Sequence, residues 1–141
     1  MFEQHTTAES RIIQWRSLRQ SAKTEQDVLN KFANIKILPR YLDYWTPKTW
    51  PNPFVIVEEG YFCATGIALL LYQTLGHLKF LNPGETQWKV ISNHVTGNDG
   101  AVFIHAEKVY NLTPGQTNSL DDLAAHSITL KDFKNLYIPL I

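Results

Sequence analysis

Apolar residues recur at helical spacing through the first quarter of the chain, and capping residues mark where each helix begins. Thr6, with Glu9 three positions later, forms a capping-box pattern that predicts a helix over residues 7–20. Thr24 is a good N-cap for a second helix over residues 25–35, whose apolar positions fall on one face. We therefore expect the N-terminal part of the chain to be helical.

The next segment breaks this periodicity. Residues 38–54 contain four prolines and five aromatic side chains, a composition too apolar for a flexible linker, so we expect a packed, irregular crossing. Residues 55–59, with the sequence VIVEE, have the composition of a short strand. Residues 62–75 are apolar nearly all round, which predicts a buried central helix that ends at Gly76.

The second half of the chain changes to strand-forming residues. Residues 86–95 and 101–112 are rich in β-branched and aromatic side chains, a TGNDG turn separates them, and the later stretch is long enough for two short strands. Ser119 and Thr129 are suitable caps for two short final helices.

Helices followed by antiparallel strands predict an α+β fold, in which N-terminal helices and a cysteine-headed central helix pack on an antiparallel sheet. The length of the chain fits a single domain over residues 1–141.

Composition excludes several classes of protein. Thirteen basic and thirteen acidic side chains cancel, so we expect no nucleic-acid partner. The longest apolar run, Ile67–Tyr72, is too short to span a bilayer, and the first ten residues lack the apolar core of a secretory signal. A single cysteine allows no internal disulfide and no multi-cysteine zinc site. We therefore expect synthesis in a reducing cytoplasm, no membrane span and no cofactor.

The one cysteine, Cys63, stands at the start of the predicted apolar helix. A helix N-terminus carries unpaired N–H groups and a partial positive charge, which favour a thiolate and could bind a developing oxyanion. Gly60 and the small residues 64–66 would let a substrate approach the backbone around the sulfur. This position suits a nucleophile, but a free cysteine is equally often a small buried apolar residue.

A thiol nucleophile also needs a base and a group that orients the base. His94 and His105 lie in the β-rich region, and Asp99 and Asn111 are the nearby orienting groups. We prefer His94, because the turn after it folds its strand back toward Asn111, whereas an extended segment would hold His105 about 20 Å from Asn111. A tight hairpin at residues 106–108 would reverse this preference. His94, His105 and Asp99 could also ligate a metal, but their spacing is not that of a zinc site.

The order of these residues resembles the papain-like superfamily, in which a cysteine heads a central apolar helix and a strand histidine and an Asp or Asn follow. The stretch KVYNLTPG at residues 108–115 is similar to the strand and Pro-Gly loop of papain-fold toxin domains from bacterial polymorphic toxin systems. The likeness covers roughly residues 60–116 and implies Cys63 as nucleophile, His94 as base and Asn111 as orienting residue.

This sequence departs from the family pattern at several points. Toxin domains often have Asp where this chain has Asn111, and the spacing from His94 to Asn111 is longer than the family pattern leads us to expect. No glutamine stands shortly before Cys63 as a second oxyanion donor, the nearest upstream amide being Asn52.

The sequence thus predicts a cysteine-dependent amide hydrolase, either a peptidase or a glutamine deamidase, with a protein substrate. The toxin resemblance further implies delivery to a target cell and a cognate immunity protein. The alternative is a non-enzymatic interaction module, such as an immunity or adaptor protein, with a structural cysteine. In that case Tyr44, Trp45 and Trp50 would form the contact surface, unless they pack in the core.

Overall fold

The computed structural model describes residues 1–3, 5–39 and 41–141. The helices are α1 (Ala8–Ser21), α2 (Glu25–Phe32), α3 (Pro53–Glu59), α4 (Ala64–His77) and α5 (Leu120–His126), with short 3-10 helices at Pro47–Thr49 and Pro83–Glu85. The strands are β1 (Thr86–Asn93), β2 (Asp99–His105), β3 (Lys108–Tyr110) and β4 (Ser127–Phe133). They form an antiparallel sheet in the order β3-β2-β1-β4.

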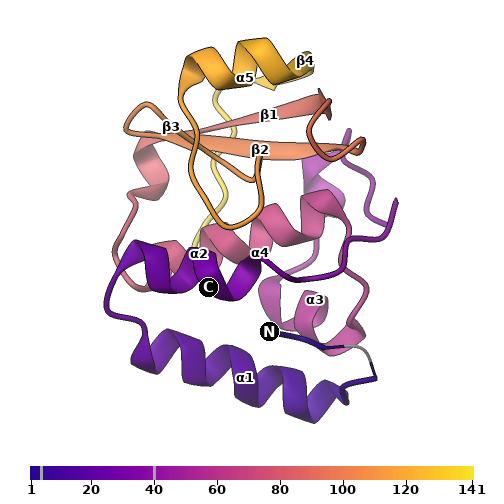
Figure 1. Cartoon of the computed structure of the whole chain (residues 1–141), viewed down its shortest axis with the longest axis vertical. Helices are drawn as coiled ribbons and strands as arrows, with labels where there is room; N and C mark the ends of the chain where they lie inside the picture. The colour runs from indigo at the N-terminus through magenta and orange to yellow at the C-terminus, as the bar shows by residue number, and fades with distance from the viewer. Residues whose placement is uncertain (4, 40) are drawn as a thin grey trace.

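The elements are stacked in layers (Figure 1). Helix α4 crosses one face of the sheet over β2, with α2 and α3 packed beside it, and α1 lies on the side of α3 that faces away from the sheet. Helix α5 covers part of the opposite face. The predicted α+β fold, with helices packed on an antiparallel sheet, is therefore confirmed.

Helix α4 is the centre of the main core. Its residues are buried from Thr65 to Gly76, as its apolar composition predicts. The Tyr72 ring packs edge-on against Trp88 of β1 and Phe103 of β2, with ring centroids 5.1 and 5.6 Å apart. A smaller cluster fills the space between the sheet and α5; its buried members are Ile91, Val102, Ile104, Val109, Leu112 and Leu123.

Local capping places several helix ends where the sequence predicts them. Thr24 forms a complete capping box with Asp27, and Ser119 does the same with Asp122. Helix α1 begins one residue later than expected, because Thr7 rather than Thr6 accepts the Ser10 N–H.

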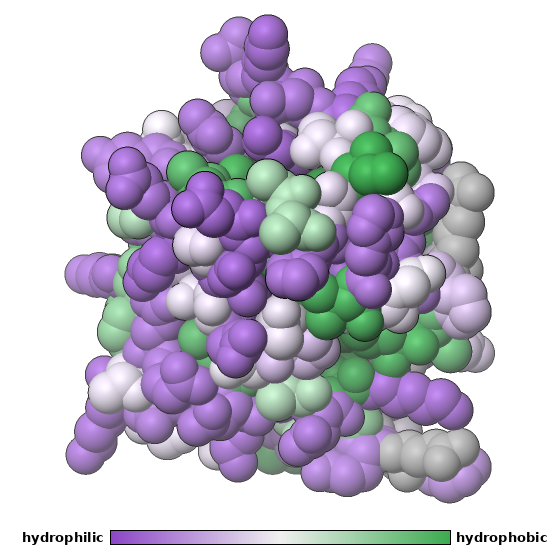
Figure 2. Space-filling view, turned by 45° about the horizontal axis from the view of Figure 1, so that its top comes forward, coloured by the Kyte–Doolittle hydropathy of each residue, from purple (hydrophilic) through white to green (hydrophobic). Residues whose placement is uncertain are grey.

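Two predicted elements are wrong. Residues 55–59 belong to helix α3 rather than to a strand, because Asn52 caps it, Pro53 occupies its first turn and Gly60 ends it at φ 71°. Residues 130–133 belong to strand β4 rather than to a helix capped by Thr129, because they pair with β1. In Figure 2 the top of Figure 1, where α5 and β4 lie, is turned toward the viewer. This face shows mainly polar residues with separate apolar patches.

The C-terminal segment returns to α4. Tyr72 donates its hydroxyl to the Ile138 carbonyl at 2.6 Å, and the Gln73 amide donates to Pro139 O at 2.9 Å. Helix α4 continues past Gly76 to His77, and the missing side chain at Gly76 makes room for Leu140. Within the described residues we find no helix long and apolar enough to cross a membrane.

Candidate active site at the head of helix α4

Cys63 is the N-cap residue of α4, as its position in the sequence predicts. Its sulfur accepts the Gly66 N–H at 3.4 Å and the Leu42 N–H at 3.5 Å. Leu38 forms a parallel bridge with Cys63, and its N–H donates to the Phe62 carbonyl at 2.7 Å. The residue is only 3% exposed, so these neighbours cover the thiol.

Asn111 lies at the same end of α4. It follows β3 with a left-handed backbone, φ 74°, and is half-buried. Its side-chain amide nitrogen donates to the carbonyls of Ala64, at 2.9 Å, and Ala101, at 3.0 Å. The structure therefore brings two of the predicted site residues, Cys63 and Asn111, to the head of one helix, where the amide ties the first residue of α4 to β2.

The start of β2 packs against the first turn of α4, next to Asn111. Ala101 donates its N–H to the Thr65 hydroxyl at 3.1 Å. A Cβ added at Gly100 would lie 2.7 Å from the Ala64 Cβ and 3.3 Å from the Thr65 nitrogen. The backbones of β2 and α4 therefore approach too closely to leave room for a side chain at position 100. The neighbouring positions in β2 are Asp99 and Ala101.

His94 follows the end of β1 and is exposed. Its backbone N–H donates at 2.8 Å to the carbonyl of His126, where α5 ends and β4 begins, and the side-chain amide of the preceding Asn93 donates to Leu112 O at 2.9 Å. In the described residues, the hydrogen bonds of Cys63 and Asn111 do not include the His94 ring. The role of His94 as a base stays a prediction, and the present conformation does not assemble it.

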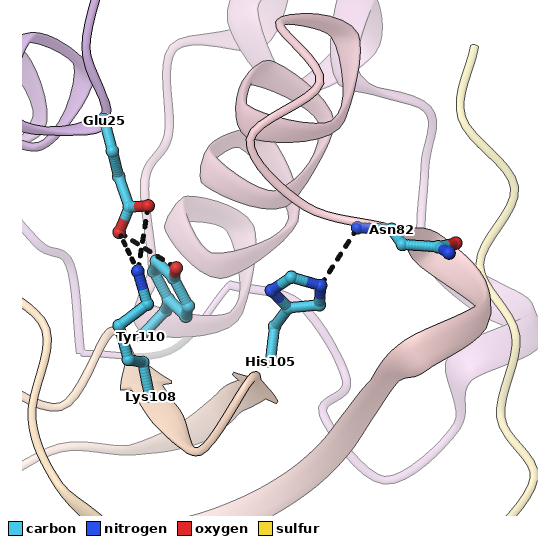
Figure 3. A network of polar contacts seen from close by, with 5 residues as sticks. All are labelled: Glu25, Asn82, His105, Lys108 and Tyr110. Atoms are coloured by element: carbon cyan, nitrogen blue, oxygen red, sulfur yellow. Dashed lines mark hydrogen bonds and ion pairs between the residues drawn. The ribbon is translucent and has the colours of Figure 1, made fainter.

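His105 lies at the far end of β2, where it pairs with Thr86. Its Nε2 accepts the Asn82 N–H at 3.1 Å (Figure 3). The same nitrogen lies 4.0 Å from a Glu85 carboxylate oxygen. Five residues along an extended strand place it about 17 Å from Gly100, at the opposite end of the sheet from Cys63.

The hairpin between β2 and β3 is tight, since Ala106 and Glu107 have φ of 50° and 63°. A tight hairpin here is the condition under which the sequence would favour His105 over His94 as the base. Its register nevertheless pairs His105 with Lys108 and Phe103 with Tyr110. Asn111 therefore lies beyond the Phe103 pair and does not meet His105, which is a correction to the second candidate base.

The metal interpretation is also wrong in this fold. Asp99 and His105 occupy opposite ends of β2, so they cannot share an ion with His94. Among the described residues, no group of three or more His, Cys, Asp or Glu side chains is arranged to hold a metal ion.

A polar network that the sequence did not reveal supports the strand before Asn111 (Figure 3). The Glu25 carboxylate of α2 accepts from the Tyr110 hydroxyl at 2.9 Å and from the Lys108 ammonium at 3.1 Å. Burial, and then the bond to Glu25, raise the pKa of Tyr110. No signal in the sequence could pair these residues, because they are 83 and 85 positions apart.

The aromatic residues of the crossing divide between the core and the surface. Tyr44 is 8% exposed, and Trp50 is half-buried against Trp88, with ring centroids 5.7 Å apart, so two of the three expected contact residues are packed. Trp45 is 40% exposed, as a contact residue would be. Sequence reasoning missed Tyr61, which is 55% exposed two residues before the cysteine.

Comparison with known proteins identifies the fold. No family model and no curated protein sequence matches the chain. Among solved structures, calcium-bound Legionella pneumophila LapG matches with a TM-score of 0.68 and 12% identity, over 93% of this chain and 78% of that one. A second LapG structure matches with a TM-score of 0.68 and 13% identity, over 92% and 77%. EGTA-treated LapG matches with a TM-score of 0.64 and 15% identity, over 90% and 74%. The chain therefore has the fold of LapG, and the predicted papain-like fold is confirmed.

Proposed function

We propose that this chain uses a papain-like scaffold to bind a protein partner without hydrolysing it. The observation that carries the proposal is the enclosure of Cys63, which is 3% exposed and accepts two backbone N–H groups. One of these donors is Leu42, so a substrate carbonyl would have to displace that residue before it reached the sulfur. The cysteine then has a structural role, as the N-cap of the central helix.

The strand beside the thiol supports the same conclusion. A general base must come within about 2.6–3.2 Å of the atom whose proton it takes. Gly100 of β2 lies against the first turn of α4 and has no space for a side chain. His94 and His105 are hydrogen-bonded to other elements, through a backbone N–H and a ring nitrogen respectively. In the described residues neither imidazole is hydrogen-bonded to the sulfur, whose partners are the N–H groups of Leu42 and Gly66.

The contact surface in this proposal consists of exposed aromatic residues on the segment that includes Leu42 and on the segment that leads into Cys63. We call Tyr41, Trp45 and Tyr61 the aromatic surface; they are 46%, 40% and 55% exposed. The Tyr41 and Tyr61 rings are in contact, with centroids 5.3 Å apart, and the Tyr41 hydroxyl donates to Glu59 at 2.6 Å. Tyr and Trp are favoured anchors of protein interfaces, because they bury a large area and lose little entropy. A protein segment is the ligand class that suits such a surface.

A thiol-directed probe tests whether the site is catalytic. Native protein would be incubated with a peptidyl vinyl sulfone and, separately, with iodoacetamide, and adduct formation would be followed by intact mass. We expect slow modification of the native thiol with both reagents and rapid modification after unfolding in urea. Fast vinyl sulfone labelling that His94→Ala abolishes and His77→Ala leaves unchanged would overturn the proposal.

A second experiment tests the aromatic surface. Proteins captured from cells that express the tagged chain would be quantified by mass spectrometry for wild type, Trp45→Ala and Tyr61→Ala. We expect one partner to be retained by wild type and lost with both variants. Tyr137→Ala is the matched control, because Tyr137 is equally exposed, at 60%, and lies outside the aromatic surface. Retention of every captured protein by both variants would argue against this surface.

Cysteine peptidase activity is the second candidate. It is favoured by one observation, the common position of Cys63 and Asn111 at the N-terminus of α4, where main-chain N–H groups face the sulfur. His94 would act as base after rearrangement of the turn that follows β1. A deamidase reaction, delivery as a toxin and a cognate immunity protein are finer alternatives within this candidate, and the vinyl sulfone experiment is the first test of all of them.

A further inference from the structure

A cavity of about 520 Å³ lies away from the cysteine, between the 3-10 helix at Pro47–Thr49, the segment that follows it and the C-terminal segment. Leu69 and Gln73, from the second and third turns of α4, belong to its lining. Trp50 and Ile138 also line it. Its volume is within the range of about 300–1,000 Å³ that is usual for small-molecule sites.

The walls of this cavity present few free hydrogen-bonding groups. The Gln73 amide is already bonded to Pro139 O and to the Ile141 N–H, at 2.9 and 3.0 Å. The Trp50 indole N–H donates to the Asp43 carbonyl at 2.8 Å, and the Asn52 side chain caps α3. Prolines contribute much of the remaining wall and have no N–H; they are Pro47, Pro51, Pro53 and Pro139. A ligand inside the cavity must therefore be mainly apolar.

The rim of the cavity adds one charged side chain and further apolar surface. Lys48 is the one charged side chain among the described residues that line it. Lys48 is exposed and forms no ion pair in the described part of the chain. Tyr137 and Ile141 are also lining residues and are 60% and 64% exposed. A ligand with an apolar tail and an anionic head would cover these side chains and neutralise the ammonium group.

From this arrangement we infer that the cavity binds a medium-chain fatty acid. The tail lies against Trp50 and Leu69, and the carboxylate meets the Lys48 ammonium at the rim. This site goes beyond the proposed function, because it uses neither Cys63 nor the aromatic surface.

Tryptophan fluorescence provides the test, because Trp50 lines the cavity. Native protein would be titrated with 11-bromoundecanoate, whose bromine quenches an indole that it touches. We expect saturable quenching below the critical micelle concentration of the probe, and loss of most of it in Trp50→Phe. Titration calorimetry with dodecanoate should show affinity about two- to five-fold weaker in Lys48→Ala, the range expected for an exposed ion pair. Dodecanol, which has no charge, should bind both proteins equally.

Lys36→Ala is the matched control, since Lys36 is an exposed lysine that lines a different cavity. Equal weakening in Lys36→Ala and Lys48→Ala, tighter binding of dodecylamine than of dodecanoate, or the absence of saturable quenching would each overturn the inference. Because neither measurement depends on the thiol or on a protein partner, failure here leaves the proposed function untouched, and the reverse is also true.

Discussion

Gly100 of β2 lies so close to Ala64 of α4 that a Cβ at position 100 would stand 2.7 Å from the Ala64 Cβ. The contact presses the start of the strand against the first turn of the cysteine-headed helix. Because Asn111 then bonds to Ala64 and Ala101, strand, helix and amide are locked together at this point. The contact holds the head of α4 against the sheet and leaves no room for a side chain at position 100.

Filling this space should destabilise the protein. We expect Gly100→Ala to lower the free energy of unfolding by about 1–3 kcal/mol, the usual result of overpacking. Addition of Ala64→Gly should recover most of the loss, because it removes the atom that the new methyl meets. Urea denaturation of the two single variants and the double variant measures this coupling.

Gly84→Ala is the control for the loss of glycine itself, since the nearest atom to a Cβ at that position is 3.5 Å away and it should change stability little. A double variant no more stable than Gly100→Ala would show that the Ala64 contact is not the cause.

Replacement of the cysteine separates its cap from its thiol chemistry. A serine hydroxyl at position 63 can accept the N–H groups of Gly66 and Leu42, so we expect Cys63→Ser to stay within about 1 kcal/mol of wild type. Cys63→Ala loses the acceptor and should be less stable by about 0.5–2 kcal/mol. Thermal and urea unfolding compare the two. Equal stabilities would mean that the sulfur contributes nothing as a cap.

The network that anchors β3 makes a further prediction. We expect Glu25→Ala to destabilise the protein by about 1–3 kcal/mol, because it leaves the buried Tyr110 hydroxyl without its carboxylate partner. Tyr110→Phe in the same chain removes the unpaired hydroxyl and should recover part of the loss. Glu85→Ala is the control, since that carboxylate is 72% exposed and 4.0 Å from His105. Independent, additive effects at Glu25 and Tyr110 would contradict the pairing.

The Asp27 carboxylate, which belongs to the capping box of α2, should contribute to the pH dependence of the free energy of unfolding. Backbone N–H groups of Lys23 and Thr24 lower the pKa of Asp27 below its ordinary value of 3.8. Because the pKa of Asp27 is lower in the folded state than in the unfolded chain, the ionised carboxylate stabilises the fold at any pH above the unfolded-state pKa. This stabilisation disappears as the pH falls through the lower, folded-state pKa.

Unfolding of wild type and Asp27→Asn should therefore differ most near neutral pH and converge below pH 3.8. Asp121→Asn, in the first turn of α5 and outside its capping box, is the control. A difference between wild type and Asp27→Asn that is constant with pH would show that the charge of the cap is irrelevant.

Features that depend on neighbours along the chain could be predicted from the sequence. Thr24 and Ser119 cap their helices as expected, since a cap is a bond between residues two or three positions apart. The apolar residues of α4 predict a buried central helix because such a surface is stable only inside a core. The position of Cys63 at the head of that helix follows from where this apolar pattern begins and from the place of a cap just before it.

Features that depend on packing could not be predicted in this way. The polar stretch of β4 is a strand because it pairs with β1, and Glu25 meets Tyr110 across 85 positions. His94 and His105 are both strand-region histidines in sequence, yet the register sends one beside β4 and the other to the far end of β2. Asn111 bonds to Ala64, the residue after Cys63, and Gly100 lies against the same turn of α4. Register and the close approach of two backbones arise from contacts between residues distant in sequence, and no local pattern encodes them.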